Sequence, residues 1–253
     1  VCMVLVFLGA IGFPVLIEVK TYLVKKDPMF RFSLFTKITT ATYAGLFALG
    51  TLVILILESF YSFRGMQWHE ALFSAMFHSV STRSAGLTTY DVTTFSEATG
   101  LFMSGLMFIG ASPSSVGGGI RTTTFAIIIL FMLAYSRGHS DIQVFKREIH
   151  LIDVFRSFAV LVFAIFMVLV AMMILLITEQ HATMTQILFE ITSAFGTCGM
   201  SLGITQDLST VGKFVIMALM FIGRVGLISF LYSIGGTAKK KKYHYPKERI
   251  IIG

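Results

Sequence analysis

The chain has 253 residues, of which 55% are hydrophobic and only 13% are charged, and its mean hydropathy is +0.83. About a quarter of the residues of a soluble globular domain are normally charged, so this composition excludes that class and predicts a membrane protein. The net charge of +7 does not indicate nucleic acid, because in a membrane protein the positions of basic residues matter more than their sum. We therefore expect membrane lipid, and no nucleic acid, as a partner.

The chain opens with an uncharged run, residues 1–17, without the basic start of a signal or transit peptide. Its length is at the short limit for crossing a hydrocarbon layer of ~30 Å. Gly9, Gly12 and Pro14 lie inside the run. We interpret it as the end of a helix in a longer chain, of which this sequence is the later part.

Four later stretches are apolar enough and long enough to cross a membrane. Residues 38–57 and 157–178 are uncharged throughout and predict complete crossing helices. Residues 98–136 are interrupted by a glycine-rich run, and residues 208–238 are interrupted by Arg224. These two predict broken crossing helices.

Two other apolar pieces, residues 71–82 and 182–195, are too short to cross. Each runs into small and hydroxylated residues, which predicts a re-entrant hairpin that enters and leaves the membrane on one side.

The basic residues indicate the orientation. Fifteen of the 20 lysines and arginines lie in three segments that alternate with the crossings, and the positive-inside rule makes these segments cytoplasmic. The re-entrant pieces then descend from the outer face. The fifteen are Lys20, Lys25, Lys26, Arg31, Lys37, Arg137, Lys146, Arg147, Arg156, Lys239, Lys240, Lys241, Lys242, Lys247 and Arg249.

The pattern of crossing, re-entrant hairpin and crossing occurs twice. The pentapeptide LMFIG at residues 106–110 returns at residues 219–223, an offset of 113, and the same offset takes Gly86 to Gly199. Two landmarks at one spacing predict an internal duplication, with parallel copies that bring Gly86 and Gly199 together. We expect three parts: residues 1–37, a first copy at 38–150 and a second copy at 151–253.

Each short apolar helix is followed by a glycine set among small or hydroxylated residues, in residues 79–89 and 192–203. A helix that stops inside the membrane leaves backbone carbonyls unpaired, and rings of such carbonyls can replace the hydration shell of an ion. Glycine allows backbone angles that other residues resist. A tight turn in an outer loop is the alternative for either segment alone.

Residues 110–119 contain Pro113 and four glycines, which cannot continue a helix. A phosphate-binding loop is not predicted, because the GxxxxGK[ST] pattern is missing. A flexible linker is possible, but hydrophobic helix on both sides favours a loop at membrane depth that obstructs a pathway. Arg224 is far from the cytoplasmic end of its helix and predicts a buried contact, for example with the carbonyls of this loop.

Enzymatic chemistry is not expected. The six histidines form no metal-ligand motif, and no carboxylate is placed to orient His78 toward Ser81 as in a nucleophilic triad. An intramembrane enzyme and a secondary transporter that works by alternating access remain alternatives, the latter because broken helices and hairpins also build transporter sites.

Four motifs carry a resemblance to a known family: STRSAG at 81–86, FIGASPSSVGGGIRTTT at 108–124, TSAFGTCG at 192–199 and GRVG at 223–226. Across nearly its whole length the chain resembles the Trk/Ktr/HKT superfamily of potassium transporters, and most closely the membrane subunit of bacterial Ktr systems. The resemblance implies an all-α polytopic membrane protein with tandem helix–pore loop–helix repeats of potassium-channel type. Of four such repeats, this chain resembles the end of the second, the third and the fourth.

The resemblance also implies roles for individual residues. The implied potassium selectivity filter comprises Thr82, Arg83, Ser84, Ala85, Gly86, Gly196, Thr197, Cys198 and Gly199, with potassium on the backbone carbonyls near Gly86 and Gly199. The implied gating loop comprises Gly110, Ala111, Ser112, Pro113, Ser114, Ser115, Val116, Gly117, Gly118, Gly119 and Arg121, where Arg121 replaces a lysine of many relatives. Arg224 matches an arginine thought to hold that loop closed.

Cofactors and partners follow from the resemblance alone. It implies a homodimer in the bacterial cell membrane on a cytoplasmic ring of regulatory subunits, which bind ATP or ADP, and sodium-stimulated potassium uptake. The nucleotide is expected on the partner and not on this chain.

Overall fold

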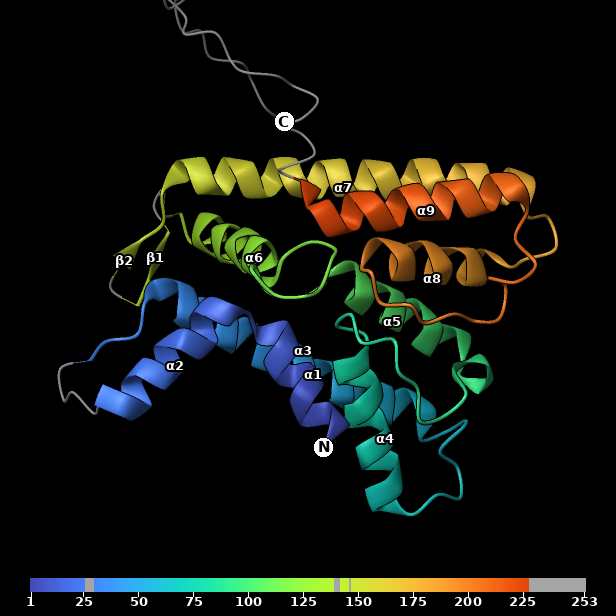
Figure 1. The fold of residues 1–253 in the computed structure, drawn as a ribbon, viewed down its shortest axis with the longest axis horizontal. Coiled ribbons are helices and arrows are strands. Elements are labelled where there is room, and N and C mark those ends of the chain that lie inside the picture. The colour runs from blue at the N-terminus through green and yellow to red at the C-terminus, as the bar shows by residue number, and fades with distance from the viewer. Residues whose placement is uncertain (26–29, 139–141, 146, 228–253) are drawn as a thin grey trace, which may run out of the picture.

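The computed structural model describes residues 1–25, 30–138, 142–145 and 147–227, and helices dominate them (Figure 1). The predicted basic tail from Lys239, with Lys26 and Lys146, lies outside the described residues. The described elements are α1 (Cys2–Ile11), α2 (Phe13–Lys25), α3 (Leu34–Glu58), α4 (Trp68–Ser81), the short 3-10 helix η1 (Val92–Thr94), α5 (Glu97–Phe108), α6 (Thr122–Ser136), strands β1 (Gln143–Val144) and β2 (Arg147–Glu148), α7 (Leu151–Thr178), α8 (Met184–Phe195) and α9 (Thr210–Val225).

Helices α3 and α7 are the two described helices that are individually long and apolar enough to cross a membrane. They have 25 and 28 residues, so at 1.5 Å per residue even the shorter one is about 37 Å long. The prediction that residues 38–57 and 157–178 form helices long and apolar enough to cross is confirmed. The predicted boundary after residue 150 coincides with the start of α7, whereas the boundary after residue 37 falls within the first turn of α3.

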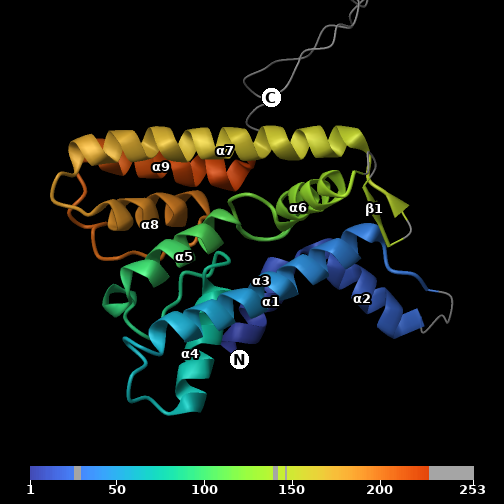
Figure 2. The same ribbon diagram turned by 180° about the vertical axis from the view of Figure 1, so that it is seen from behind.

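Helices α4 and α8 are the two short helices expected before the glycine-containing segments 79–89 and 192–203. They have 14 and 12 residues, too few to span the hydrocarbon layer. Helix α8 begins with a reciprocal pair of hydrogen bonds between Thr183 and Gln186, a capping box that fixes its first turn. In Figures 1 and 2, α8 lies beneath α7 and α9, next to α5.

The N-terminal run is not the single helix end that we expected. Helices α1 and α2 meet at an angle of 101° at Gly12, whose φ of 98° lies in the left-handed region that favours glycine. The physical reason is tertiary, because a side chain at Gly12 would lie 2.7 Å from the carbonyl oxygen of Pro113. The chain turns here to pass residues 110–119.

The two copies of LMFIG have different secondary structure. In the first copy the helix ends at Phe108 and resumes only at Thr122. In the second copy α9 continues through the pentapeptide, passes Arg224 and ends at Val225, directly before Gly226, which has a φ of 90°. The break expected at Arg224 lies just after that residue, because the chain leaves the helix at Gly226, where glycine permits a left-handed backbone.

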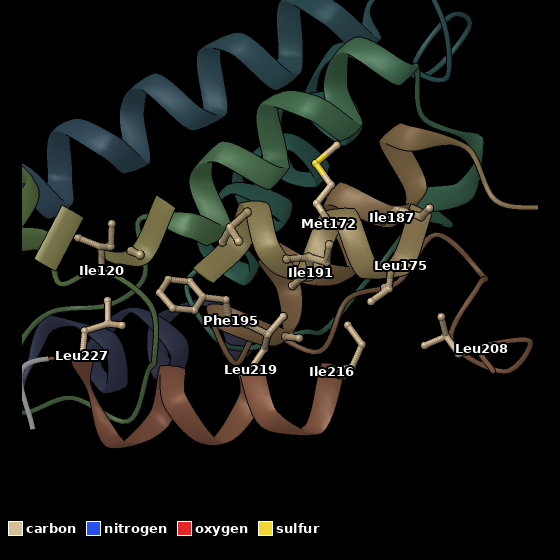
Figure 3. Packing of buried hydrophobic residues seen from close by; sticks show 14 of the residues in the cluster. Ile120, Met172, Leu175, Ile187, Ile191, Phe195, Leu208, Ile216, Leu219 and Leu227 are labelled. Carbon is tan, nitrogen blue, oxygen red and sulfur yellow. The ribbon is translucent and has the colours of Figure 1, made fainter. Parts of the chain in front are cut away.

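The main apolar core joins α7, α8 and α9 (Figure 3). Ile187, Ile191 and Phe195 of α8 are fully buried against Leu175 of α7 and Leu219 of α9. Lipid is as apolar as these side chains, so packing rather than the exclusion of water holds such helices together in a membrane. This core fixes the end of α8, and residues 196–199 follow directly after it.

Candidate functional site

Two loops of similar conformation follow α4 and α8. We call residues 82–86 the first re-entrant loop and residues 196–199 the second re-entrant loop. Each has left-handed residues at alternate positions: Ser84 (φ 83°) and Gly86 (φ 65°) in the first, Thr197 (φ 50°) and Gly199 (φ 94°) in the second. This alternation prevents a regular helix or strand, so carbonyls in both loops are available to a ligand.

A serine in the last turn of each short helix closes its loop. The Ser81 hydroxyl donates to the carbonyl of Leu87, and the Ser193 hydroxyl donates to the carbonyl of Met200. Both acceptors directly follow the glycine of their loop. The same kind of hydrogen bond therefore closes both loops, although the serines are 112 residues apart and the acceptors 113, so the second loop is one residue longer.

The two re-entrant loops are in direct contact. Ser84 Oγ donates to the carbonyl oxygen of Gly196 at 2.8 Å, and Cys198 Sγ lies 3.2 Å from the carbonyl oxygen of Ser81. A side chain at Gly86 would meet the Cys198 carbonyl oxygen at 2.2 Å, so the backbones approach as closely as glycine allows. The structure thus brings together the two glycines that the offset of 113 paired.

Residues 110–119, which we call the break loop, lie against both re-entrant loops. A side chain at Gly117 would lie 2.5 Å from Ser84 Oγ, and one at Gly118 would lie 2.7 Å from Thr197 Oγ1. The Thr197 hydroxyl is buried and has no hydrogen-bond partner in the described part of the chain. The three groups that the sequence singled out therefore form one continuous site.

The bend between α1 and α2 holds the middle of the break loop, a contact that the sequence did not predict. Ser112 N–H donates to the carbonyl oxygen of Ala10 at 3.1 Å, and Phe13 N–H donates to that of Ser114 at 3.3 Å. Proline and glycine on the two sides were visible as helix breakers, but nothing in the sequence showed that the two breaks meet.

The three arginines of interest differ in their surroundings. Arg121 is half-buried and donates to the carbonyl oxygen of Gly117 in the break loop. Arg83 is 3% exposed and donates to the carbonyl oxygen of Ile109, so its side chain points away from its own loop. Arg224 is exposed, and the expected buried contact with the break loop is not found among the described residues. Its helix continues past it, and Arg121 holds the loop carbonyl instead.

A cavity of about 170 Å³ lies next to the end of the break loop. Its lining includes Gly119 and Arg121 from the loop, with Val225 and Gly226 from the end of α9. The end of the loop and the end of the second-copy helix therefore share one small, partly polar space.

Two glutamates that the sequence analysis did not single out, Glu58 and Glu179, have a structural role. Glu58, at the end of α3, accepts hydrogen bonds from the Ser96 amide and hydroxyl, both at 3.0 Å. Glu179, after α7, accepts from the Ser209 amide at 3.0 Å and from its hydroxyl. Ser96 and Ser209 are 113 residues apart and each directly precedes a helix. This spacing was the signal in the sequence that could have identified the two serines as equivalent.

The charge of Glu179 is stabilised at this position. Burial raises the pKa of Glu179, but the hydrogen bonds from the Ser209 hydroxyl and amide outweigh it, so the pKa lies below the ordinary value of 4.5. A carboxylate thus ties each long helix to the start of a later helix, α3 to α5 through Glu58 and α7 to α9 through Glu179.

Comparison with known proteins places this chain in a family. The family model described as cation transport protein, TrkH, matches residues 1–235. The chain is 53% identical over its whole length to Ktr system potassium uptake protein D of Bacillus subtilis, and 38% identical over 97% of its length to Ktr system potassium uptake protein B of the same organism. It covers 56% and 54% of those proteins, about half of each.

A solved structure shares the fold. The crystal structure of the potassium transporter TrkH from Vibrio parahaemolyticus superposes with a TM-score of 0.73 over 92% of this chain and 50% of that one, at 18% identity. This agrees with an all-α, multi-pass membrane protein. Together, the family match and the identity over the full chain show that this chain belongs to the TrkH family of cation transport proteins.

Proposed function

We propose that this chain forms part of the conducting membrane subunit of a potassium uptake system. Potassium passes over backbone carbonyls of the re-entrant loops around Gly86 and Gly199, and the break loop acts as the gate beneath them. The observation that carries this proposal is the direct contact of Gly117 and Gly118 with Ser84 and Thr197.

The chemistry of the loops supports potassium as the cargo. Carbonyl oxygens replace water around an alkali cation without requiring a charged side chain. The left-handed residues Ser84, Gly86, Thr197 and Gly199 free such carbonyls in both loops. The names of the relatives in Bacillus subtilis, which are potassium uptake proteins, support the same ion. Two loops do not close a ring, so other parts of the complete protein supply the rest of the filter.

The remaining features of the proposal follow the family resemblance. The subunit works as a homodimer on a cytoplasmic ring of nucleotide-binding subunits, ATP and ADP act on that ring, and sodium stimulates uptake. The basic cytoplasmic segments, of which Arg137 and Arg147 are exposed, are suited to docking such a ring. Conduction is passive and driven by the membrane potential.

Uptake in cells that lack their own potassium transport tests the proposal. The complete protein that contains this chain is expressed with and without substitutions at Gly86 and Gly199, and potassium, rubidium and sodium uptake are compared. We expect the parent to restore potassium uptake and both substitutions to alter the ion preference. Restored uptake with unchanged preference would move selectivity away from these loops, and no uptake by the parent would reject the function.

A further inference from the structure

The ends of broken helices leave carbonyl oxygens without partners, and α5 ends inside the molecule. Two of its last carbonyls are satisfied by backbone: that of Gly105 accepts from Ile109 N–H at 3.2 Å, and that of Phe108 accepts from Ile120 N–H at 3.1 Å. The carbonyls of Leu106 and Ile109 both face Arg83 Nη1.

The reason why Ile109 needs such a partner lies in the sequence. In a continuing helix, its carbonyl would accept from the amide of residue 113. That residue is Pro113, which has no N–H. The guanidinium of Arg83 occupies the place of the missing donor, and the negative end of the α5 dipole favours its positive charge.

The second copy provides an internal comparison. The offset of 113 takes Ile109 to Ile222 and Pro113 to Gly226. Gly226 has an amide, and it donates to the Ile222 carbonyl at 3.2 Å. The same offset takes Arg83 to Gly196, which has no side chain. The first copy therefore has Arg83 and lacks the backbone donor at Pro113. The second copy has the backbone donor at Gly226 and a glycine, Gly196, in place of the arginine.

We propose that Arg83 is a positioning residue that couples the first re-entrant loop to the start of the break loop. It leaves its own loop and binds the end of α5, so a displacement of either loop is transmitted to the other. Its burial, with 3% exposure, makes the coupling stiff, because the guanidinium has no access to water as an alternative partner. The inference rests on the proposed function and adds to it a link between filter and gate.

A double-mutant cycle tests this link in the complete protein reconstituted in liposomes. Arg83→Met removes the donor, and Pro113→Ala restores an amide that can serve the Ile109 carbonyl. We expect Arg83→Met alone to reduce both the potassium flux and the preference for potassium over sodium. In the Pro113→Ala background, the loss of flux and selectivity caused by Arg83→Met should be smaller by about three-fold or more. Coupling of this size is usual for groups in contact.

A second variant and a second measurement separate positioning from general loss of structure. Arg83→Lys keeps a charge that reaches one carbonyl and should recover part of the selectivity. Hydrogen exchange in Arg83→Met should increase at the amides of residues 109–120 and not in α7. Arg64→Met, at an exposed arginine in an outer turn, is the matched control and should behave like the parent.

The outcomes distinguish the inference from the function. An active parent with equal costs of Arg83→Met in both backgrounds, or with no cost at all, overturns the coupling and leaves the proposed function standing. Faster exchange throughout the molecule assigns Arg83 to general stability and also overturns it. A parent that transports no potassium rejects the proposed function, and the local exchange result then decides whether Arg83 holds the break loop.

Discussion

At the scale of single residues, the two loop glycines have the same backbone handedness but different surroundings. A side chain at Gly86 would collide with the Cys198 carbonyl oxygen at 2.2 Å, whereas one at Gly199 meets nothing within 4 Å. The neighbour at Gly86 is a backbone carbonyl, which cannot move aside to make room for a new methyl group as a flexible side chain could. A side chain at Gly86 therefore causes a steric clash, and one at Gly199 causes only backbone strain. The sequence alone did not indicate this difference.

We expect Gly86→Ala to disrupt the contact between the loops, with a large loss of uptake and an altered ion preference in the uptake that remains. Gly199→Ala meets only the strain of a left-handed residue, roughly 1–2 kcal/mol, and should reduce discrimination while retaining uptake. Ion competition in uptake assays measures both. Gly45→Ala, in open space within α3, is the control and should be neutral. Equal effects at Gly86 and Gly199 would contradict the geometry.

At the scale of elements, the break loop has a closed base. Ile120 N–H donates to the Phe108 carbonyl at 3.1 Å, and Gly110 and Gly118 are in contact. The loop can therefore be shortened without separating α5 from α6. Its tip at Ser114 and Val116 is exposed, whereas Gly117 to Gly119 are buried beside the re-entrant loops.

Deletion of residues 112–117 is expected to raise the potassium flux, because it removes the segment that lies against Ser84. Flux through reconstituted protein, normalised to the amount in the membrane, is the measurement. If normal amounts of the shortened protein conduct no faster than the parent, the loop is a linker and not a gate.

The carboxylate ties between helices predict a dependence on pH. Because the folded-state pKa of Glu179 lies below its ordinary value, its contribution to stability is present above about pH 4.5 and is lost as the pH falls through the lower, folded-state pKa. In thermal unfolding in detergent between pH 3 and pH 7, the melting temperature of Glu179→Gln should fall less on acidification than that of the parent. Parallel curves for the two proteins would exclude this role.

At the scale of the whole molecule, the charge distribution predicts which loops face which side. Gln180 lies just after the end of α7, in a predicted outer connection, and Arg137 directly follows α6, in the predicted inner connection that leads to the start of α7. Of the two cysteines, Cys2 is exposed and Cys198 is buried, so a Cys2→Ser background is suitable for labelling.

In that background, Gln180→Cys should react with a membrane-impermeant maleimide on intact cells, and Arg137→Cys should react only after permeabilisation. Transport by both variants is the control for correct folding. Labelling of Arg137→Cys from outside would reverse the orientation and would place the re-entrant loops at the inner face.

The class of protein, its long apolar helices, the duplication and the residues of the three loops could all be predicted from the sequence. These depend on composition, apolar length and glycine or proline, which act locally. The same pentapeptide ends a helix at Phe108 and continues one through Phe221, and the local difference is the residue three positions after it, Pro113 in one copy and Gly226 in the other. Contacts between distant residues could not be predicted in this way. The bend at Gly12, the contact of the break loop with Thr197 and the reach of Arg83 to Ile109 all join residues far apart in the chain. Such contacts depend on where backbone donors and acceptors meet after packing, and no local pattern records them.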